Sequence, residues 1–273
     1  MDFFSLCVRN DAQLGELFQA LLFSLGATQK EVLSRFAATV ASSGRIGVNM
    51  RPTVLQELLA SGEWFNIHEW AEKVAHKSSK SKEGILQEKL GPFYDKRVAF
   101  DAYFAGGESF RYGALNIGGL GTERYGEFCV VLRHEEMTAT CEIGYLQSDS
   151  LRTYVSDKGV DGTALEKECS SDAAKHLLCS LKHSAELDAA SEETWPQMVC
   201  NQDQYVEAIF VGGLSAEKIQ SVRISKGLYE LYYEYVYNEY REKLSELDRY
   251  RTDTFARIDE YLDQLSIPWE EVT

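Results

Sequence analysis

The sequence predicts a mixed α+β fold with helices at both ends of the chain and a β-sheet between them. Leucine, phenylalanine and valine recur at helical spacing through the first 42 residues. Short segments rich in β-branched and aromatic residues follow, bounded by glycines, as is typical of strands. A long helical pattern closes the chain. We therefore expect an N-terminal helical region at 1–42, a central domain at 43–225 and a C-terminal helical segment at 226–273.

Length and composition narrow the class of protein. Of the 273 residues, 44% are hydrophobic and 26% charged, as in ordinary globular proteins. The chain has no apolar run of membrane-spanning length, its N-terminus opens with an acid rather than with the basic residues of a secretory signal, and its six cysteines include no C-x-x-C pair. We therefore expect a soluble, cytoplasmic protein with reduced thiols. We expect no metal, because no histidine pair lies at zinc-ligand spacing beside the cysteines.

The acidity of the chain limits its partners. A formal net charge of −15 argues against general attraction to nucleic acid, because phosphate binding relies on clustered lysine and arginine. A local basic groove remains compatible with that charge. The excess of acid fits either solubility or the binding of a basic partner, and the sequence leaves both interpretations open.

The first expected strand is RIGVNM at 45–50, in which apolar residues alternate with polar or small ones. Thr53 is the expected N-cap of the next helix and Gly62 its terminator. Residues 64–76 are compatible with a helix, and the lysine-rich stretch KSSKSKEG that follows predicts a mobile loop.

Besides the strand-like segment FRYGALN at 110–116, four more strands are expected downstream. EFCVVLR at 127–133 and MTATCEIGY at 137–145 are short enough to form an antiparallel pair with each other. QYVEAIFVGG at 204–213 and QSVRIS at 220–225 predict the other two. Between the first strand and these four, the glycine-rich stretch at 91–126 is expected to contain no long helix.

Glu207 is the most informative polar residue for chemistry. The chain has no P-loop, no G-x-S-x-G nucleophile elbow and no H-E-x-x-H zinc motif. Glu207 interrupts an otherwise apolar strand, and an unpaired carboxylate is costly to bury. It must therefore face solvent, as on an edge strand, or be held in a cleft.

Several blocks of the chain resemble, in order, those of a bacterial family. The blocks are GRIGVNMRP, YGALN, RYGEFCVVLR and QYVEAIFVGGLSAEKIQSVRI, and they lie between Gly44 and Ile224. The last block is also similar to the glutamate strand of ADP-ribosyltransferases. YGALN is the most distinctive block. The sequence departs from the family's pattern at Arg51-Pro52, where the family has His-Pro, and it lacks the short serine-containing strand motif of many arginine-type transferases.

The resemblance implies a fold, a substrate and a set of site residues. The fold would be an ADP-ribosyltransferase-like split antiparallel β core, and the substrate NAD. Glu207 would stabilise the sugar cation, Arg51 or Arg45 would hold the ribose or pyrophosphate, and Tyr112 would stack on the nicotinamide. The catalytic candidates are Glu207, Arg51 and Tyr112, and the NAD-binding candidates are Arg45, Asn49, Arg111, Gly113, Asn116 and Tyr125.

The implied activity is mono-ADP-ribosyl transfer to a protein, RNA or DNA acceptor, as in a toxin or phage-defence effector restrained by an antitoxin or other regulatory protein. The C-terminal segment carries a set of tyrosines that covers more than one helix face: Tyr229, Tyr232, Tyr233, Tyr235, Tyr237 and Tyr240. They would pack on the chain's own domain or contact that partner. A catalytically inactive binding or inhibitor protein and an NAD hydrolase are the alternatives.

Overall fold

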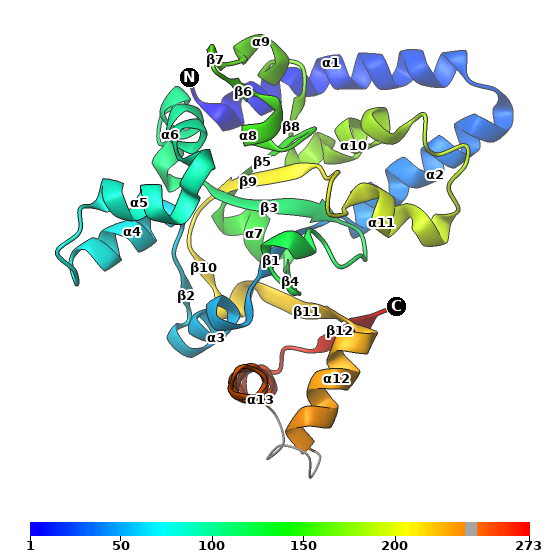
Figure 1. Ribbon diagram of the computed structural model, residues 1–273. Coiled ribbons are helices and arrows are strands. Elements are labelled where there is room, and N and C mark those ends of the chain that lie inside the picture. The colour runs from blue at the N-terminus through cyan, green and yellow to red at the C-terminus, as the bar shows by residue number, and fades with distance from the viewer. Residues whose placement is uncertain (238–244) are drawn as a thin grey trace.

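The computed structural model describes residues 1–237 and 245–273, and its centre is an eight-stranded sheet (Figure 1). The strands of this sheet are β1 (Arg45–Met50), β3 (Arg111–Asn116), β4 (Phe128–Leu132), β5 (Glu142–Leu146), β8 (Cys169–Ser171), β9 (Glu207–Val211), β11 (Ile219–Ser225) and β12 (Trp269–Val272). Their order is β12-β11-β4-β1-β3-β9-β5-β8. Neighbours are antiparallel except β11 and β12, which are parallel.

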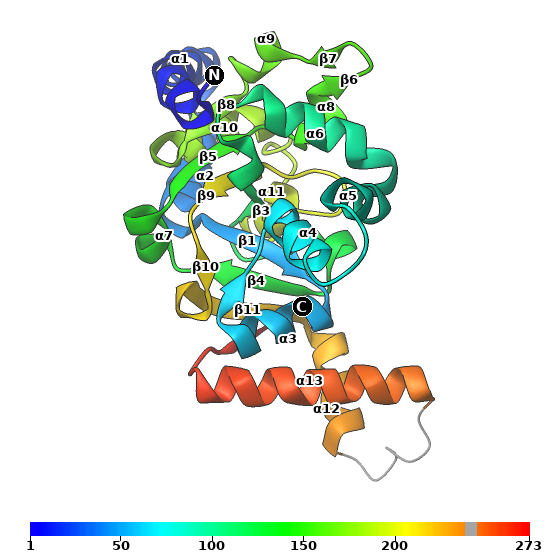
Figure 2. The same cartoon turned by 90° about the vertical axis from the view of Figure 1, so that its left-hand side faces the viewer.

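Helices surround this sheet, and two small ribbons lie beside it. The helices are α1 (Phe3–Ser24), α2 (Ala27–Ser43), α3 (Pro52–Ser61), α4 (Ile67–Ala75), α5 (Lys82–Leu90), α6 (Tyr94–Tyr103), α7 (His134–Thr140), α8 (Ser150–Thr153), α9 (Gly162–Leu165), α10 (Lys175–His183), α11 (Trp195–Val199), α12 (Lys226–Tyr237) and α13 (Glu246–Gln264). β2 (Glu63–Trp64) pairs with β10 (Leu214–Ser215), and β6 (Val155–Ser156) pairs with β7 (Gly159–Val160). Figure 2 shows α13 crossing the end of the molecule opposite α1. Among the described residues, no helix is both long and apolar enough to cross a membrane.

The two faces of the sheet bury different cores. Ile46 and Val48 of β1 belong to a large apolar cluster with side chains from α2, α3, α10 and α13. Gly47 pairs with Ala114, and Ala114 pairs with Glu207, so these three residues share the opposite face. On that face, α1 and α6 cover β9 and β5 with a second cluster of phenylalanine, leucine and tyrosine side chains. Glu207 therefore begins a central strand on the side covered by α6.

Several expected elements are confirmed. RIGVNM forms β1, and the strands expected at 127–133, 204–213 and 220–225 appear as β4, β9 and β11. Gly62 ends α3 with φ of 74°, a left-handed conformation that favours glycine. The helix expected within 64–76 is α4. Short segments rich in apolar and β-branched residues were a sufficient signal for these strands, because β4 and β9 are buried almost throughout in the core.

Other expectations are wrong. Arg51, not Thr53, is the N-cap of α3, because Pro52 suits the first helical position and sets the start of the helix. The segment Met137–Thr140 ends helix α7 instead of beginning a strand. β4 and β5 do not pair, since β4 lies between β1 and β11 while β5 lies between β9 and β8. The glycine-rich stretch, by contrast, has no long helix, as expected: the α-helix within 91–126 is α6, which has 10 residues.

The N-terminal region has the expected secondary structure, whereas the C-terminal region has it only in part. α1 and α2 occupy the N-terminal region as expected. The C-terminal segment is not helical throughout, because β12 adds a parallel strand beside β11. The eight strands of the core form one mixed sheet, with β12 at its edge.

The tyrosine-rich helix α12 packs on its own domain through one side. Tyr232 is buried, stacks on Phe255 with ring centroids 4.9 Å apart, and donates a hydrogen bond of 2.7 Å to Glu127. Tyr233 is exposed on the same helix. Tyr240 lies outside the described residues, as does the side chain of Tyr237.

Candidate functional site

Glu207 is buried at the start of β9, with 5% of its surface exposed. It pairs with Ala114 of β3 on one side and with Leu146 of β5 on the other. Its Oε2 atom accepts a hydrogen bond of 2.8 Å from the backbone N–H of Ser150, the first residue of α8. The strand is thus not an edge strand, and the carboxyl group lies inside the molecule.

Burial raises the pKa of Glu207 to about 8. The positive charge of Arg97 and the hydrogen bond from Ser150 lower this pKa, while the negative charge of Asp149 raises it further. The hydroxyl groups of Tyr154 and Tyr205 also lie within electrostatic range of the carboxyl group. Glu207 is therefore mostly protonated at neutral pH and poised to change its charge near that pH.

An inner polar cluster lies beside Glu207, between α6 and β3. The Arg97 guanidinium stacks on the Tyr112 ring, 3.6 Å from its centroid. The Tyr112 hydroxyl donates a 2.5 Å hydrogen bond to Asp101, which also contacts Arg97 at 3.4 Å. His68 of α4 contacts the second oxygen of Asp101 at 2.7 Å. Because each group has a partner, the cluster holds a buried guanidinium in a fixed position near Glu207.

An outer polar cluster lies on the side of Asp149, the N-cap of α8. The hydroxyl groups of Tyr205 and Tyr125 donate to Asp149 at 2.6 and 3.3 Å. Arg124 donates to the same carboxylate at 3.3 Å and stacks 4.8 Å from the Tyr125 ring centroid. Tyr125 is 49% exposed, and Nε of Arg124 is buried with no hydrogen-bond partner in the described part of the chain. This cluster gives the region of Glu207 a polar, aromatic side that reaches solvent.

The structure places two sequence-predicted residues in these clusters, Tyr112 in the inner one and Tyr125 in the outer one. It does not place either candidate arginine beside Glu207. Arg51 is exposed, four residues beyond Gly47 and two strands from Glu207, which at ordinary strand dimensions separates their Cα atoms by roughly 16 Å. Arg45 donates to the carbonyl groups of Ser42 and Gly44 and so holds the end of α2.

The remaining candidates have structural contacts. Asn49 donates to the carbonyl groups of Leu120 and Gly126 and holds the loop at 117–126 over the sheet. Asn116 holds the start of the same loop through Gly118 and Gly119.

Gly113 and Arg111 also serve packing. A Cβ atom at Gly113 would meet the carbonyl oxygen of Gly47 at 2.8 Å, so this glycine allows two strands to approach and does not face a ligand. Arg111 donates a 2.6 Å hydrogen bond to Glu69 and joins β3 to α4.

Sequence reasoning missed most of the groups around Glu207. Arg97 and Asp101 are four residues apart on α6, a spacing that places them on one helix face, but the glycine-rich surroundings argued against a helix. Asp149 is the N-cap of α8, and aspartate is a preferred N-cap residue, so QSDS at 147–150 could have indicated the start of a helix there. Arg124 directly precedes Tyr125 in the RYG block.

No model of a known protein family matches the chain, and no curated protein matches its sequence. Within residues 1–237 and 245–273, no three histidine, cysteine, aspartate or glutamate side chains are grouped so that they could hold a metal ion. The groups around Glu207 that can take part in chemistry are carboxyl, guanidinium and phenol groups.

The raised pKa of Glu207 predicts a pH-dependent stability. Between the ordinary pKa of 4.5 and the folded value of about 8, the folded protein binds this proton more tightly than the unfolded chain does. The stabilisation from the protonated carboxyl is therefore complete below 4.5 and is lost as the pH rises through 8. Relative to Glu207→Gln, the wild type should lose about 3–5 kcal/mol of unfolding free energy between pH 5 and pH 8.5. Urea denaturation of both proteins at several pH values measures this difference, and parallel curves would contradict it.

Proposed function

We propose that the chain is an NAD-consuming mono-ADP-ribosyltransferase, with Glu207 as its catalytic carboxyl group and an ADP-ribosyltransferase-like arrangement of β1, β3 and β9. The observation that carries the proposal is the position of Glu207, which is buried on a central strand between the Arg97–Tyr112 stack and the Asp149–Tyr205 pair. Its one printed hydrogen bond, from the backbone N–H of Ser150, offsets only part of the cost of burying a carboxyl group, so a chemical role would explain its presence.

The reaction breaks the bond between the nicotinamide nitrogen and the ribose C1 atom. The bonding electron pair leaves with nicotinamide, and positive charge develops on the sugar. The acceptor then bonds to C1 and releases a proton. A buried carboxyl group interacts weakly with a ligand while it is neutral, and strongly once a nearby cation favours its ionised form. Glu207 would therefore stabilise the cationic transition state more than it stabilises bound, unreacted NAD.

The outer cluster is the side from which NAD would approach. Arg124 would bind the pyrophosphate, because a guanidinium group donates paired hydrogen bonds to phosphate oxygens. Tyr125 would stack on a ring of the dinucleotide. In this proposal Arg124 takes the role first assigned to Arg51 or Arg45, while Tyr112 positions Arg97.

The acceptor is a protein, RNA or DNA, and the enzyme acts as a toxin or phage-defence effector controlled by a regulatory protein. The exposed Tyr233 side of α12 is the proposed contact for that regulator. Incubation of the purified chain with adenine-labelled NAD and cell extract tests the proposal. Labelled macromolecules with release of nicotinamide support it. Nicotinamide release without labelled macromolecules indicates an NAD hydrolase, and no release removes the enzymatic reading.

A catalytically inactive binding protein is the second candidate. The 5% exposure of Glu207 and the distant positions of Arg45 and Arg51 favour it. Titration calorimetry with NAD separates the two candidates, because an inactive protein of this kind should show no heat of NAD binding.

The pH dependence of turnover follows from the same carboxyl group. If the ionised form of Glu207 is required, kcat/KM for NAD should rise about tenfold per pH unit below the pKa of about 8 and level off above it. Positive charge on bound NAD lowers the pKa of Glu207, so the kcat profile should level off at a lower pH. Rates of nicotinamide release between pH 5.5 and 9 measure both profiles, and a flat kcat/KM profile would argue against this role.

A further inference from the structure

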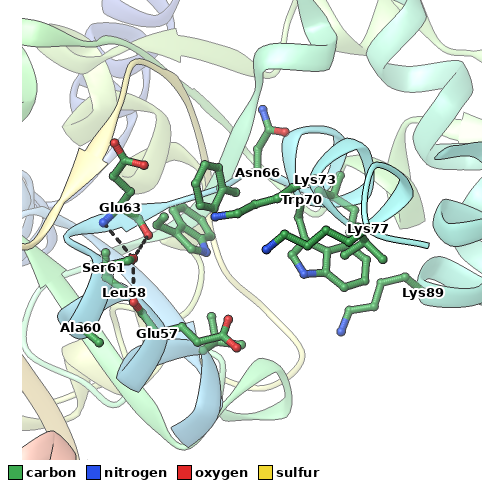
Figure 3. A pocket seen from close by; sticks show the side chains of 15 residues that line it. Glu57, Leu58, Ala60, Ser61, Glu63, Asn66, Trp70, Lys73, Lys77 and Lys89 are labelled. Carbon is green, nitrogen blue, oxygen red and sulfur yellow. Dashed lines mark hydrogen bonds between the residues drawn. The ribbon is translucent and has the colours of Figure 1, made fainter.

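A hollow of about 680 Å³ lies between α3, β2 and α4, apart from the Glu207 site (Figure 3). Its wall includes the aromatic side chains of Trp64, Phe65 and Trp70. Trp64 packs against Phe210, three residues beyond Glu207 on β9 and on the other face of that strand. The volume is in the range of small-molecule sites, which are mostly apolar with a few polar groups.

Three lysines give this hollow a positive edge in a chain whose net charge is −15. Figure 3 shows the ammonium groups of Lys73 and Lys77 directed from α4 toward α3, with Lys89 of α5 beside them. Lys73 lies 4.0 Å from the Phe65 ring centroid, and Lys89 lies 5.2 Å from that of Trp70.

The three lysines differ from their neighbours in having no acid partner among the described residues. Lys80 pairs with Glu88, and Lys82 lies 3.5 Å from Glu108. Lys73, Lys77 and Lys89 form no ion pair with any residue in 1–237 or 245–273. Their charges are therefore available to an anion, and Lys73 and Lys89 each lie over an aromatic ring.

Glu57 of α3 supplies a carboxylate on the opposite side of the hollow. A ligand that uses both sides needs an anionic group for the lysines, a flat apolar part for the indole rings and hydrogen-bond donors for Glu57. A nucleotide has all three in its phosphates, base and hydroxyl or amino groups. A fatty acid would leave Glu57 against its hydrocarbon chain, which has no donor.

We propose that this hollow is a nucleotide-binding site, in which Trp64 and Trp70 contact the base and Lys73, Lys77 and Lys89 bind the phosphates. Stacking of a base on an aromatic side chain is sequence-tolerant, and lysine binds phosphate as a point charge. The site is independent of Glu207 and of the proposed reaction.

Titration calorimetry with ADP on the full chain tests this proposal. ADP should bind saturably, and K73Q/K77Q should weaken binding about tenfold or more, since each lost charged contact reduces the binding free energy. K158Q, which removes an exposed lysine on the β6–β7 turn, is the matched control and should bind ADP as the wild type does. Adenosine and inorganic phosphate, each carrying half of the required chemistry, should bind more weakly than ADP.

The outcomes also separate this site from the proposed NAD site. Glu207→Gln should retain ADP binding, and K73Q/K77Q should retain any nicotinamide release from NAD. The absence of saturable ADP binding would overturn the proposal, as would equal affinities of K73Q/K77Q and the wild type. Decanoate binding more tightly than ADP would assign the hollow to fatty acids instead.

Discussion

For the proposed transferase, Glu207→Gln is expected to lower kcat for the release of nicotinamide from NAD by at least 10²–10³-fold. Glutamine has nearly the same shape and can still accept the hydrogen bond from Ser150, but it cannot become an anion as the sugar cation forms. Single-turnover assays of nicotinamide release at pH 8.5 measure the loss, because the wild-type carboxyl is then mostly ionised.

Glu142→Gln is the matched control for this substitution. Glu142 is an exposed carboxylate on β5, the strand beside β9, and it pairs with Val211 at the far end of that strand. The control should leave turnover unchanged. If Glu207→Gln releases nicotinamide as fast as the wild type, the chain cleaves NAD but the carboxyl group of Glu207 has no part in the mechanism.

The charges around Glu207 explain why a bound ligand could change the protonation of its carboxyl group. Arg97 is buried and permanently charged, and its contacts with Asp101 and Tyr112 keep it in place. The negative charge of Asp149 opposes ionisation from the other side. With these opposing influences, a modest positive charge from a substrate is enough to shift the protonation of Glu207 at neutral pH.

The sequence predicted most strands of the sheet, but it did not predict which strands pair with each other. β1 and β9 show a local signal, because apolar residues and glycine turns reveal a strand within a short window. The pairing of β4 with β1, and of β5 with β9, depends on contacts between segments far apart in sequence. The antiparallel pair expected from adjacency was therefore wrong.

The site shows the same division. Glu207 was found because an acid within an apolar strand is locally unusual. Arg97 was missed because nothing near it in sequence indicates that α6 crosses the sheet face of β9 and stacks it on Tyr112. Arg51 was favoured for its place in a block, yet it lies beyond the end of β1, where it caps α3, and β1 is two strands from Glu207.

Gly126→Ala is expected to lower the free energy of unfolding by about 3 kcal/mol or more. A Cβ atom at this position would overlap the backbone carbonyl group of Met50 and the amide of Arg51. Neither can move easily, because Met50 is paired with Phe128 of β4 and Arg51 caps α3. The backbone of Gly126 is extended, so the cost comes from the close approach of two chain segments. Urea denaturation measures the change.

Two other glycines test whether that close approach is the cause. Apart from its chain neighbours and, for Gly15, its own helix backbone, a Cβ atom at Gly213 or at Gly15 would meet no atom of the described residues within 4 Å. Gly213→Ala should therefore stay within about 0.5 kcal/mol of the wild type, and Gly15→Ala, inside α1, should gain about 0.5–1 kcal/mol. A Gly126→Ala protein as stable as these two would show that the loop carrying Arg124 and Tyr125 can withdraw from β1. In that case the outer cluster would not be held in place by its contact with the sheet.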